Sequence, residues 1–414
     1  MKIATNKSRL TAIMLVLCML MQIVFGVTAF ADGDGLNAAD TGLTPDNDGV
    51  TRTLNSLDEM ADLMVSTTYS EYKDLHAGAP EASDTVVIDA CDYDKDLTTA
   101  AVSVAFDETL GKDTLITPDS GKTVYTVDIP ATGMYTMTIK YFPIDGNGSN
   151  IERILLIDDK VPYKEARYLS FTRVWRDKEE NGYSIKDRTF KKDVNGNEMR
   201  PVKYEAPEWR TEEICDSETF FSDPLEFYFE EGTHTIAFDA ACEPLQLAEI
   251  TLHPSEKLIS YEDYLKANSD KTAPENAEAI YINAEIPIET SEQVVYAMND
   301  RTSGATEPQS TSATLLNTIG GNGGDKWKSA GQWITYEFDV EEDGMYDIVT
   351  RFKQTVNQGL YSSRSLKIDG EYPFEEAKFL QFQYDGDWQV DTLNDGTTHF
   401  SFYLSKGHHK IELK

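Results

Sequence analysis

The residue types that build metal sites and nucleophilic sites are scarce in this sequence. Only 4 Cys and 6 His occur in 414 residues, and they form no CxxC pair and no Cys/His cluster with zinc spacing. No GxSxG or HExxH motif is present. The 72 acidic residues are so numerous that any two carboxylates could be nominated as a glycosidase pair, so such a pair carries no information. The sequence therefore predicts a protein that is not an enzyme.

Cations are also in the minority. The chain has 37 Lys and Arg against 72 Asp and Glu, which gives a formal net charge of −35. A negative field of this size repels the phosphates of nucleic acids and of anionic lipids, so we expect no nucleic-acid partner. The charge suits a protein that binds neutral or cationic ligands, or calcium.

Long apolar runs are missing except near the N-terminus. Residues 10–25 are almost entirely apolar, three cations precede them, and an A-x-A cleavage site ends at Ala31. We therefore predict a signal peptide (1–31) that is cleaved after Ala31, and a secreted protein that is extracellular or associated with the cell surface. The alternative is a lipoprotein anchored at Cys18, but this Cys lies inside the apolar run and follows a Leu instead of a small residue.

Three cysteines would remain after this cleavage, namely Cys91, Cys215 and Cys242. Their number is odd, so at least one thiol of an exported protein would stay unpaired. Cys91 and Cys242 fall in the first and last predicted strands of the first repeat described below, where a disulfide could join them. The sequence leaves this disulfide and buried free thiols open, and we favour the free thiols.

The sequence contains an internal duplication, which decides its organisation. Residues 122–171 align without a gap onto residues 333–382, and 15 of the 50 positions are identical. RILLIDDKVPYKEARYLSF in the first copy thus corresponds to RSLKIDGEYPFEEAKFLQF in the second. With loops of different length the match extends to three further pairs of segments: 68–72 and 260–264, 86–90 and 280–284, and 227–236 and 402–411.

Both copies consist mainly of predicted strands. Segments such as TVYTVDI and WITYEFDV alternate apolar and polar residues, and helix signals are confined to 54–72 and 260–268. The pattern predicts an all-β protein of two tandem jelly-roll β-sandwiches, each preceded by a short helix. The predicted parts are a signal peptide (1–31), a disordered acidic linker (32–55), a helical lead-in (56–79), a first sandwich (80–255) with a long insertion near 176–222, a helical linker (256–277) and a second sandwich (278–414).

The second copy has no counterpart of the last strand of the first. The first copy continues beyond Asp239 with a predicted strand in residues 243–252, whereas the counterpart of Asp239 is Lys414. We expect the second sandwich to be truncated at this strand, the sequence to be a fragment of a longer gene, and the second sandwich to be the less stable.

One short pattern in the second copy resembles a known family. GQWITY (331–336), followed by Val340 and by DGMY (343–346), is similar to the GxWxxY…V…xGxY signature of galactose-binding-like sandwiches, including carbohydrate-binding modules of families six and thirty-five. IYINAE (280–285) resembles the first strand of these modules, which ends in Ala-Glu. The resemblance implies a structural calcium ligand at Glu285 and no other cofactor. Cys91 stands at the matching position of the first copy, which would remove a carboxylate there.

The tandem arrangement also resembles the N-terminal region of extracellular solute-binding proteins of Gram-positive bacteria. The Tyr-x-x-Tyr helices, LNTIGG…W (316–327) and RSLKIDGEYPFEEA (364–377) carry this resemblance. It implies a glycan or oligosaccharide as ligand, and the membrane components of a sugar ABC transporter as partners through a C-terminal domain that is absent here. Two alternatives remain: an accessory glycan-binding region of a secreted glycoside hydrolase, and a structural or adhesion spacer.

Sugar recognition commonly combines aromatic faces with side chains that hydrogen-bond the hydroxyl groups. The two copies diverge in the loops after equivalent strands, so we place the ligand-binding candidates there. They are Trp175, Arg176, Tyr204 and Trp209 in the first copy, and Tyr384, Asp387 and Trp388 in the second. The competing interpretation is that these aromatic residues only anchor long loops. Arg153 and Arg364, like Asp158 and Asp369, occur in both copies, and we expect them to be scaffold.

Overall fold

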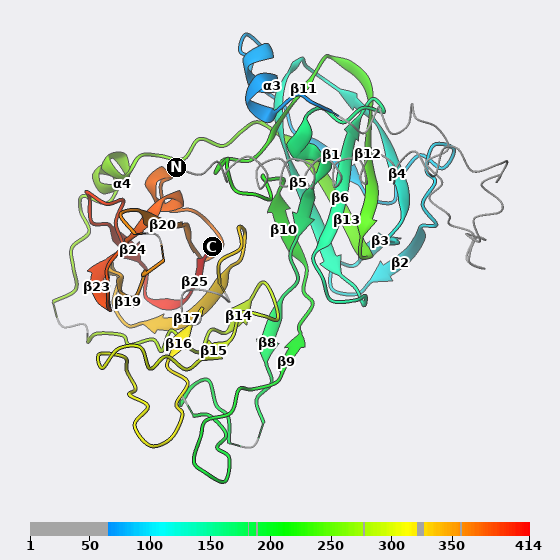
Figure 1. Ribbon diagram of the computed structural model, residues 1–414. Helices are drawn as coiled ribbons and strands as arrows, with labels where there is room; N and C mark the ends of the chain where they lie inside the picture. The colour runs from blue at the N-terminus through cyan, green and yellow to red at the C-terminus, as the bar shows by residue number, and fades with distance from the viewer. Residues whose placement is uncertain (1–64, 181, 188, 276–277, 321–326, 357) are drawn as a thin grey trace, which may run out of the picture. The chain divides into compact units, whose positions relative to one another are not determined.

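Residues 65–414 are described by the computed structural model, except 181, 188, 276–277, 321–326 and 357 (Figure 1). The predicted signal peptide, the linker 32–55 and the start of the helical lead-in lie outside the described residues. The contacts divide the chain into two units, Met1–Asn55 and Ser56–Lys414, and all described helices and strands belong to the second unit. No α-helix in the described part is long and apolar enough to span a bilayer.

The first copy folds into a β-sandwich of two antiparallel sheets. One sheet has the order β10-β5-β13-β3-β2, with β1 also paired to β13 and β11 to β5, and the other has the order β4-β12-β6-β7. The strands of the first sheet are β1 (Val86–Asp89), β2 (Ser103–Asp107), β3 (Lys112–Thr117), β5 (Gly133–Pro143), β10 (Arg210–Glu213), β11 (Glu226–Phe229) and β13 (Leu245–His253). Those of the second are β4 (Gly121–Ile129), β6 (Ile151–Ile157), β7 (Leu169–Phe171) and β12 (Gly232–Cys242).

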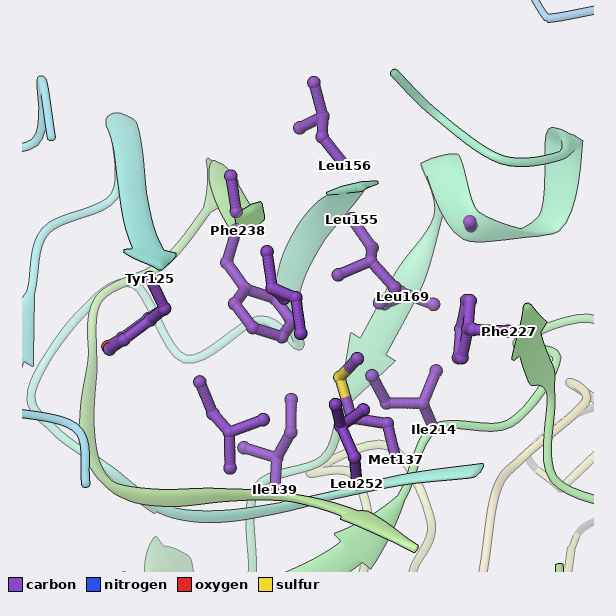
Figure 2. Packing of buried hydrophobic residues seen from close by; sticks show 14 of the residues in the cluster. Tyr125, Met137, Ile139, Leu155, Leu156, Leu169, Ile214, Phe227, Phe238 and Leu252 are labelled. Atoms are coloured by element: carbon purple, nitrogen blue, oxygen red, sulfur yellow. The ribbon is translucent and has the colours of Figure 1, made fainter. Parts of the chain in front are cut away.

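The core of this sandwich lies between the two sheets. Strand residues alternate between faces, so the apolar positions of each strand meet those of the opposite sheet. Figure 2 shows Met137 and Leu252 of one sheet opposite Leu155 and Phe238 of the other. Burying such side chains, each worth roughly 1.5–3 kcal/mol, is the main stabilisation of the fold.

The second copy repeats the four-stranded sheet in part. The sheet has the order β21-β25-β17-β14-β8-β9, in which β17, β25 and β21 correspond to β4, β12 and β6. Its own strands are β14 (Glu289–Thr290), β17 (Ile334–Val340), β21 (Leu366–Ile368) and β25 (Gly407–Leu413); β8 (Trp175–Asp177) and β9 (Lys203–Glu205) come from the insertion of the first copy. The insertion thus extends the sheet of the second sandwich through the pair Thr290 and Trp175 (Figure 1).

The other strands of the second sandwich form two-stranded ladders. These are β15 (Ala297–Met298) with β16 (Thr318–Ile319), β18 (Gly344–Asp347) with β24 (Ser401–Leu404), β19 (Val349–Phe352) with β23 (Gln389–Thr392), and β20 (Tyr361–Arg364) with β22 (Leu380–Gln383). Short 3-10 helices occupy equivalent places in the two copies, η2 (Lys164–Arg167) and η4 (Glu375–Lys378). The predicted fold class is confirmed.

A short helix precedes each sandwich and covers the edge of a strand. In α3 (Tyr69–Leu75), the hydroxyl groups of Tyr69 and Tyr72 accept hydrogen bonds from backbone N–H groups of β11, at 3.0 and 2.8 Å. In α4 (Tyr261–Ala267), Tyr261 and Tyr264 do the same for β24, at 2.8 and 2.7 Å. An exposed strand edge invites pairing with other chains, so these hydroxyl groups satisfy and shield it.

The acidic residue of the P-x-x-E-A segment holds each helix in place. The carboxylate of Glu165 accepts the N–H of Tyr69 at 2.9 Å, and that of Glu376 accepts the N–H of Tyr261 at 2.8 Å. Both N–H groups belong to a helical first turn, where no intrahelical acceptor exists. The duplicated Glu is therefore a structural cap.

The duplicated Asp residues also belong to the scaffold. Asp158 and Asp369 have φ angles of 49° and 53°, the left-handed conformation that Asp tolerates in turns. Their carboxylates contact the Nδ1 atoms of His234 and His409, each at 2.7 Å. Both pairs therefore hold a turn against the neighbouring strand.

The cysteines are free thiols in this structure. Cys91, Cys215 and Cys242 are each half-buried, and no disulfide joins them. Burial raises the pKa of the Cys91 and Cys215 thiols, which keeps them protonated and unreactive at neutral pH.

The two sandwiches differ in the size of their cores. Among the described residues, the buried apolar cluster of the first sandwich has 34 members and that of the second has 12. The second sandwich has strands corresponding to most of the first, but the described residues provide no counterpart of β13. It therefore buries less apolar surface and has less to stabilise it.

We predict that limited proteolysis of the full chain cleaves residues 278–414 before residues 80–255, because the smaller core opens locally at a lower free energy. Mass spectrometry of the early fragments measures this. A resistant 278–414 fragment beside a degraded first sandwich would contradict the prediction.

Candidate functional site

The candidates of the first copy lie on different faces of the β8–β9 hairpin. Trp175 pairs with Glu205, and Arg176 with Tyr204, so each pair points to its own side of the hairpin. Trp175 is only 9% exposed and its ring lies against Gly148, where an added Cβ would be 3.4 Å away. It therefore offers no open ring face for a sugar.

Arg176 is engaged in an ion pair with the second sandwich. Its Nε lies 2.9 Å from Oε1 of Glu289, a residue that is 1% exposed and also contacts Lys410. Burial alone would raise the pKa of Glu289, but the hydrogen bonds from Lys410 and Arg176 outweigh it and lower the pKa. A buried carboxylate with two cationic partners is a structural link, and Arg176 is committed to it. Tyr204 beside it is 44% exposed.

Trp209 is a loop anchor in this arrangement. Its ring packs on Phe142 with ring centroids 5.5 Å apart, and its Nε1 is buried without a hydrogen-bond partner among the described residues. Trp209 directly precedes β10, and the neighbouring Glu208 lies 3.4 Å from Arg176 of β8. The four predicted residues of the first copy are thus not brought together into one surface.

A buried charge cluster is centred on Arg173, which no sequence pattern indicated. This side chain is completely buried and donates to the carboxylates of Glu243 at 2.8 Å and Glu205 at 2.5 Å. Glu243 also accepts hydrogen bonds from the N–H of Asn147, at 2.9 Å, and the hydroxyl of Ser149, at 2.9 Å. The cluster thereby fixes the loop DGNGSN (145–150), which has the composition of a calcium loop but is held by protein groups.

In the second copy, the predicted residues Asp387 and Trp388 lie close to further polar side chains. Trp388 is half-buried, and its Nε1 donates to the hydroxyl of Thr306 at 2.8 Å. The guanidinium of Arg351, on β19, lies 5.5 Å from the centre of the indole ring, within cation–π range. Arg351 in turn pairs with Glu307 at 2.5 Å, so the ring is oriented by contacts to the loop 300–308.

Asp387 adds an exposed carboxylate next to the indole. It accepts the N–H of Trp388 at 2.8 Å. Its pKa is lowered, first by a hydrogen bond from the side chain of Ser303 and then by that N–H, so it is ionised at neutral pH. Lys353 lies on the same surface, paired with the buried Asp300 at 3.3 Å and with Thr302 at 2.5 Å. Tyr384 is half-buried, and its N–H donates to the carbonyl of Leu360 at 3.1 Å.

We call the set Asp300, Arg351, Lys353, Asp387 and Trp388 the Trp388 surface. The sequence predicted Asp387 and Trp388, which are neighbours in the chain, but missed the other three. The outward position of Arg351 in the alternating segment YDIVTRF could have indicated one of them. Asp300 lies in the loop 300–308 and Lys353 directly follows β19, and no local pattern links either of them to Trp388.

A shallow hollow of about 200 Å³ lies elsewhere on the described residues. It is lined by Arg200, Pro201, Lys203, Gln293 and Tyr296. The guanidinium of Arg200 covers the ring of Tyr296 at 4.1 Å, and Lys203 is bound to Asp177 at 3.0 Å. No carboxylate lines this hollow to accept hydrogen bonds from sugar hydroxyl groups, so it is a weaker candidate than the Trp388 surface.

Among the described residues, no group of three His, Cys, Asp or Glu side chains is arranged so that it could hold a metal ion. Glu285 is buried, 8% exposed. A calcium role for Glu285 stays a prediction from the sequence resemblance.

Known proteins show only limited similarity to this chain. No protein-family model and no curated protein matches the chain. Among solved structures, a family 35 carbohydrate-binding module from Clostridium thermocellum is similar at 11% identity and a TM-score of 0.26, covering 42% of this chain and 100% of that one. A family 35 module from Cellvibrio japonicus is similar at 12% identity and a TM-score of 0.25, covering 42% of this chain and 95% of that one. A β-(1,4)-mannanase from Podospora anserina with a family 35 module is similar at 12% identity and a TM-score of 0.24, covering 45% of this chain and 36% of that one. Likenesses at these TM-scores decide no function, which must be argued from the residues.

We predict that Glu243→Gln destabilises the first sandwich by about 3–5 kcal/mol, because it leaves Arg173 buried without its main counter-charge. The control Glu249→Gln, whose side chain is 38% exposed and 4.0 Å from Lys112, should cost at most about 1 kcal/mol. Urea unfolding followed by fluorescence measures both.

The same carboxylate should give a pH dependence of known sign. Burial would raise the pKa of Glu243, but the hydrogen bonds of Ser149 and Asn147 and the charge of Arg173 lower it below its unfolded value. Its stabilisation is therefore complete above the unfolded pKa and is lost as the pH falls through the folded pKa. Equal acid sensitivity of the parent and Glu243→Gln would count against this role.

Proposed function

We propose that this chain is a secreted, non-catalytic tandem module that binds carbohydrate through the Trp388 surface. The signal-like N-terminus and the GxWxxY…xGxY pattern support export and a glycan-binding fold, and the shortage of His and Cys supports a role without catalysis. The observation that carries the proposal is that Asp387 and Trp388, which are adjacent in one loop, lie together with Lys353, which directly follows β19.

The chemistry of this surface suits a sugar. An indole presents an apolar face to the CH groups of a pyranose ring, while a carboxylate accepts hydrogen bonds from its hydroxyl groups and a guanidinium or an ammonium donates them. Asp387 is exposed and ionised, and the side chain of Arg351 is 34% exposed. Contacts to Thr306 and Arg351 hold the indole in one orientation, which limits the entropy lost on binding.

The wider role that we propose is that of the N-terminal part of an extracellular solute-binding protein for a sugar transporter. It rests on the resemblance of the tandem copies and their Tyr-x-x-Tyr helices. A glycan bound here would be held at the cell surface, near transporter components that a further domain contacts. An accessory region of a secreted glycoside hydrolase would use the same surface, and the coding sequence beyond Lys414 separates the two.

We predict that the full chain retains at least one polysaccharide or oligosaccharide on a glycan array, and that Trp388→Ala weakens this binding about tenfold or more. Loss of a stacked aromatic ring together with its buried area accounts for such an effect. Isothermal titration with the best array ligand measures it, and circular dichroism checks the fold of the variant.

The matched control is Tyr296→Ala, which removes the aromatic residue of the hollow. It should bind as the parent does. If the parent binds no glycan, or if Tyr296→Ala loses binding while Trp388→Ala retains it, the proposed surface is wrong.

A further inference from the structure

The hollow of about 200 Å³ is formed jointly by the insertion of the first copy and by the second copy. Its walls come from the chain that leads into β9 and from the segment between β14 and β15, and its lining consists of Arg200, Pro201, Lys203, Gln293 and Tyr296. Two residues before Arg200, the N–H of Glu198 donates to the carbonyl of Thr314 at 2.8 Å, and the Glu198 carboxylate accepts the N–H of Leu316 at 2.7 Å. These hydrogen bonds fix the two walls relative to each other.

Apolar side chains of both copies also pack into one buried cluster beside these hydrogen bonds. The cluster consists of Tyr183, Phe190, Ile286, Ala297 and Leu316. Ala297 directly follows Tyr296 of the hollow, so the backbone of Tyr296 is anchored to this cluster. Burial of apolar surface from both copies stabilises the arrangement that forms the hollow.

Arg200 presents its guanidinium to the hollow without a described counter-ion. Its Cζ lies 4.1 Å from the centre of the Tyr296 ring. Such stacking uses the face of the guanidinium, whereas its N–H donors lie in the plane and stay accessible to a ligand. No described carboxylate forms an ion pair with Arg200, although the chain has 72 acidic residues. Pro201 restricts the preceding backbone to extended conformations, which narrows the positions that Arg200 can take.

Lys203 adds a buried ammonium group. Its side chain is 5% exposed, and its Nζ lies 3.0 Å from Oδ1 of Asp177, its cross-strand partner in the β8–β9 pair. This oxygen has no well-aligned hydrogen bond in the described part of the chain, while Tyr183 donates to Oδ2 at 3.0 Å. Burial lowers the pKa of Lys203 more than the charge of Asp177 raises it. The ammonium therefore keeps N–H donors for a further acceptor, although Asp177 balances its charge.

One positive charge at the hollow is left without a counter-charge. Asp177 neutralises Lys203, Arg200 has no such partner among the described residues, and no carboxylate belongs to the lining. A ligand with a single negative charge fits this balance. The chain as a whole has a net charge of −35, but at physiological ionic strength charges are screened over about 8 Å, so the groups in direct contact decide.

We propose that this hollow is a binding site for the carboxylate of a small hydroxy acid. The N–H donors of Arg200 would bind both carboxylate oxygens side by side, a geometry that the planar guanidinium matches. The ammonium of Lys203 and the carboxamide of Gln293 would hydrogen-bond the carboxylate and the neighbouring hydroxyl group. The hollow shares no residue with the Trp388 surface, so the inference does not depend on the proposed glycan binding.

The probe for the test is lactate, and its matched control is lactamide, which has nearly the same shape but no charge. We expect an NMR titration of the full chain, in a buffer free of other carboxylates, to show saturable lactate binding. Two or three charge-assisted hydrogen bonds would give a Kd on the order of 1 mM. Lactamide should bind about tenfold more weakly or not at all, because it cannot balance the charge of Arg200.

Two variants of the chain localise the site. Arg200→Gln removes the charge of an exposed side chain, so the fold should be retained, which circular dichroism checks, and lactate binding should weaken about tenfold or more. Lys192→Gln removes the same charge from an exposed residue of the same insertion that does not line the hollow, and it should bind lactate as the parent does.

Three results would overturn the inference: no saturable lactate binding well above the expected Kd, equal affinities for lactate and lactamide, or unchanged binding by Arg200→Gln. An equal loss in Lys192→Gln and Arg200→Gln would overturn it as well, since the overall charge of the chain and not the hollow would then govern the binding of the acid.

Discussion

Backbone N–H and C=O groups at strand edges need hydrogen-bond partners. This requirement explains how the edges of both sandwiches are covered. The Tyr-x-x-Tyr helices place phenolic hydroxyl groups against β11 and β24 and so satisfy edges that would otherwise face solvent. In the second sandwich, β17 is followed by β14 and then by β8 and β9 from the insertion. Several other strands of the second sandwich, β18 and β19 among them, are paired along one edge only in the described part of the chain. The buried apolar cluster of this sandwich is also the smaller one.

Some of the scarce cations of this acidic chain form buried ion pairs. Arg173 is completely buried against Glu243 and Glu205, and Glu289 is buried against Arg176 and Lys410. Charges of this kind add specificity more than net stability, since desolvation offsets most of their attraction. In the insertion of the first copy, Trp175 is buried and Trp209 packs against Phe142.

The Trp388 surface differs from these clusters in its exposure. Its carboxylate at Asp387 is open to solvent and the side chain of Arg351 is 34% exposed, so these two groups retain hydrogen-bonding capacity beside the more buried Lys353. The second sandwich thus carries this accessible loop surface on a smaller buried apolar cluster than that of the first sandwich.

The sequence by itself determined the duplication, the all-β class, the two helices and the scaffold role of the repeated Asp residues, because these follow from alternation and internal alignment within each copy. It also indicated Trp388 and Asp387, which are adjacent in the chain. Only the tertiary structure decided that β8 and β9 join the sheet of the second sandwich, that Trp175 is buried, and that Asp300, Arg351 and Lys353 meet Trp388. The physical reason is that periodicity shows which face of a strand is apolar, whereas the partner of a strand edge or of a loop charge depends on how distant segments pack together.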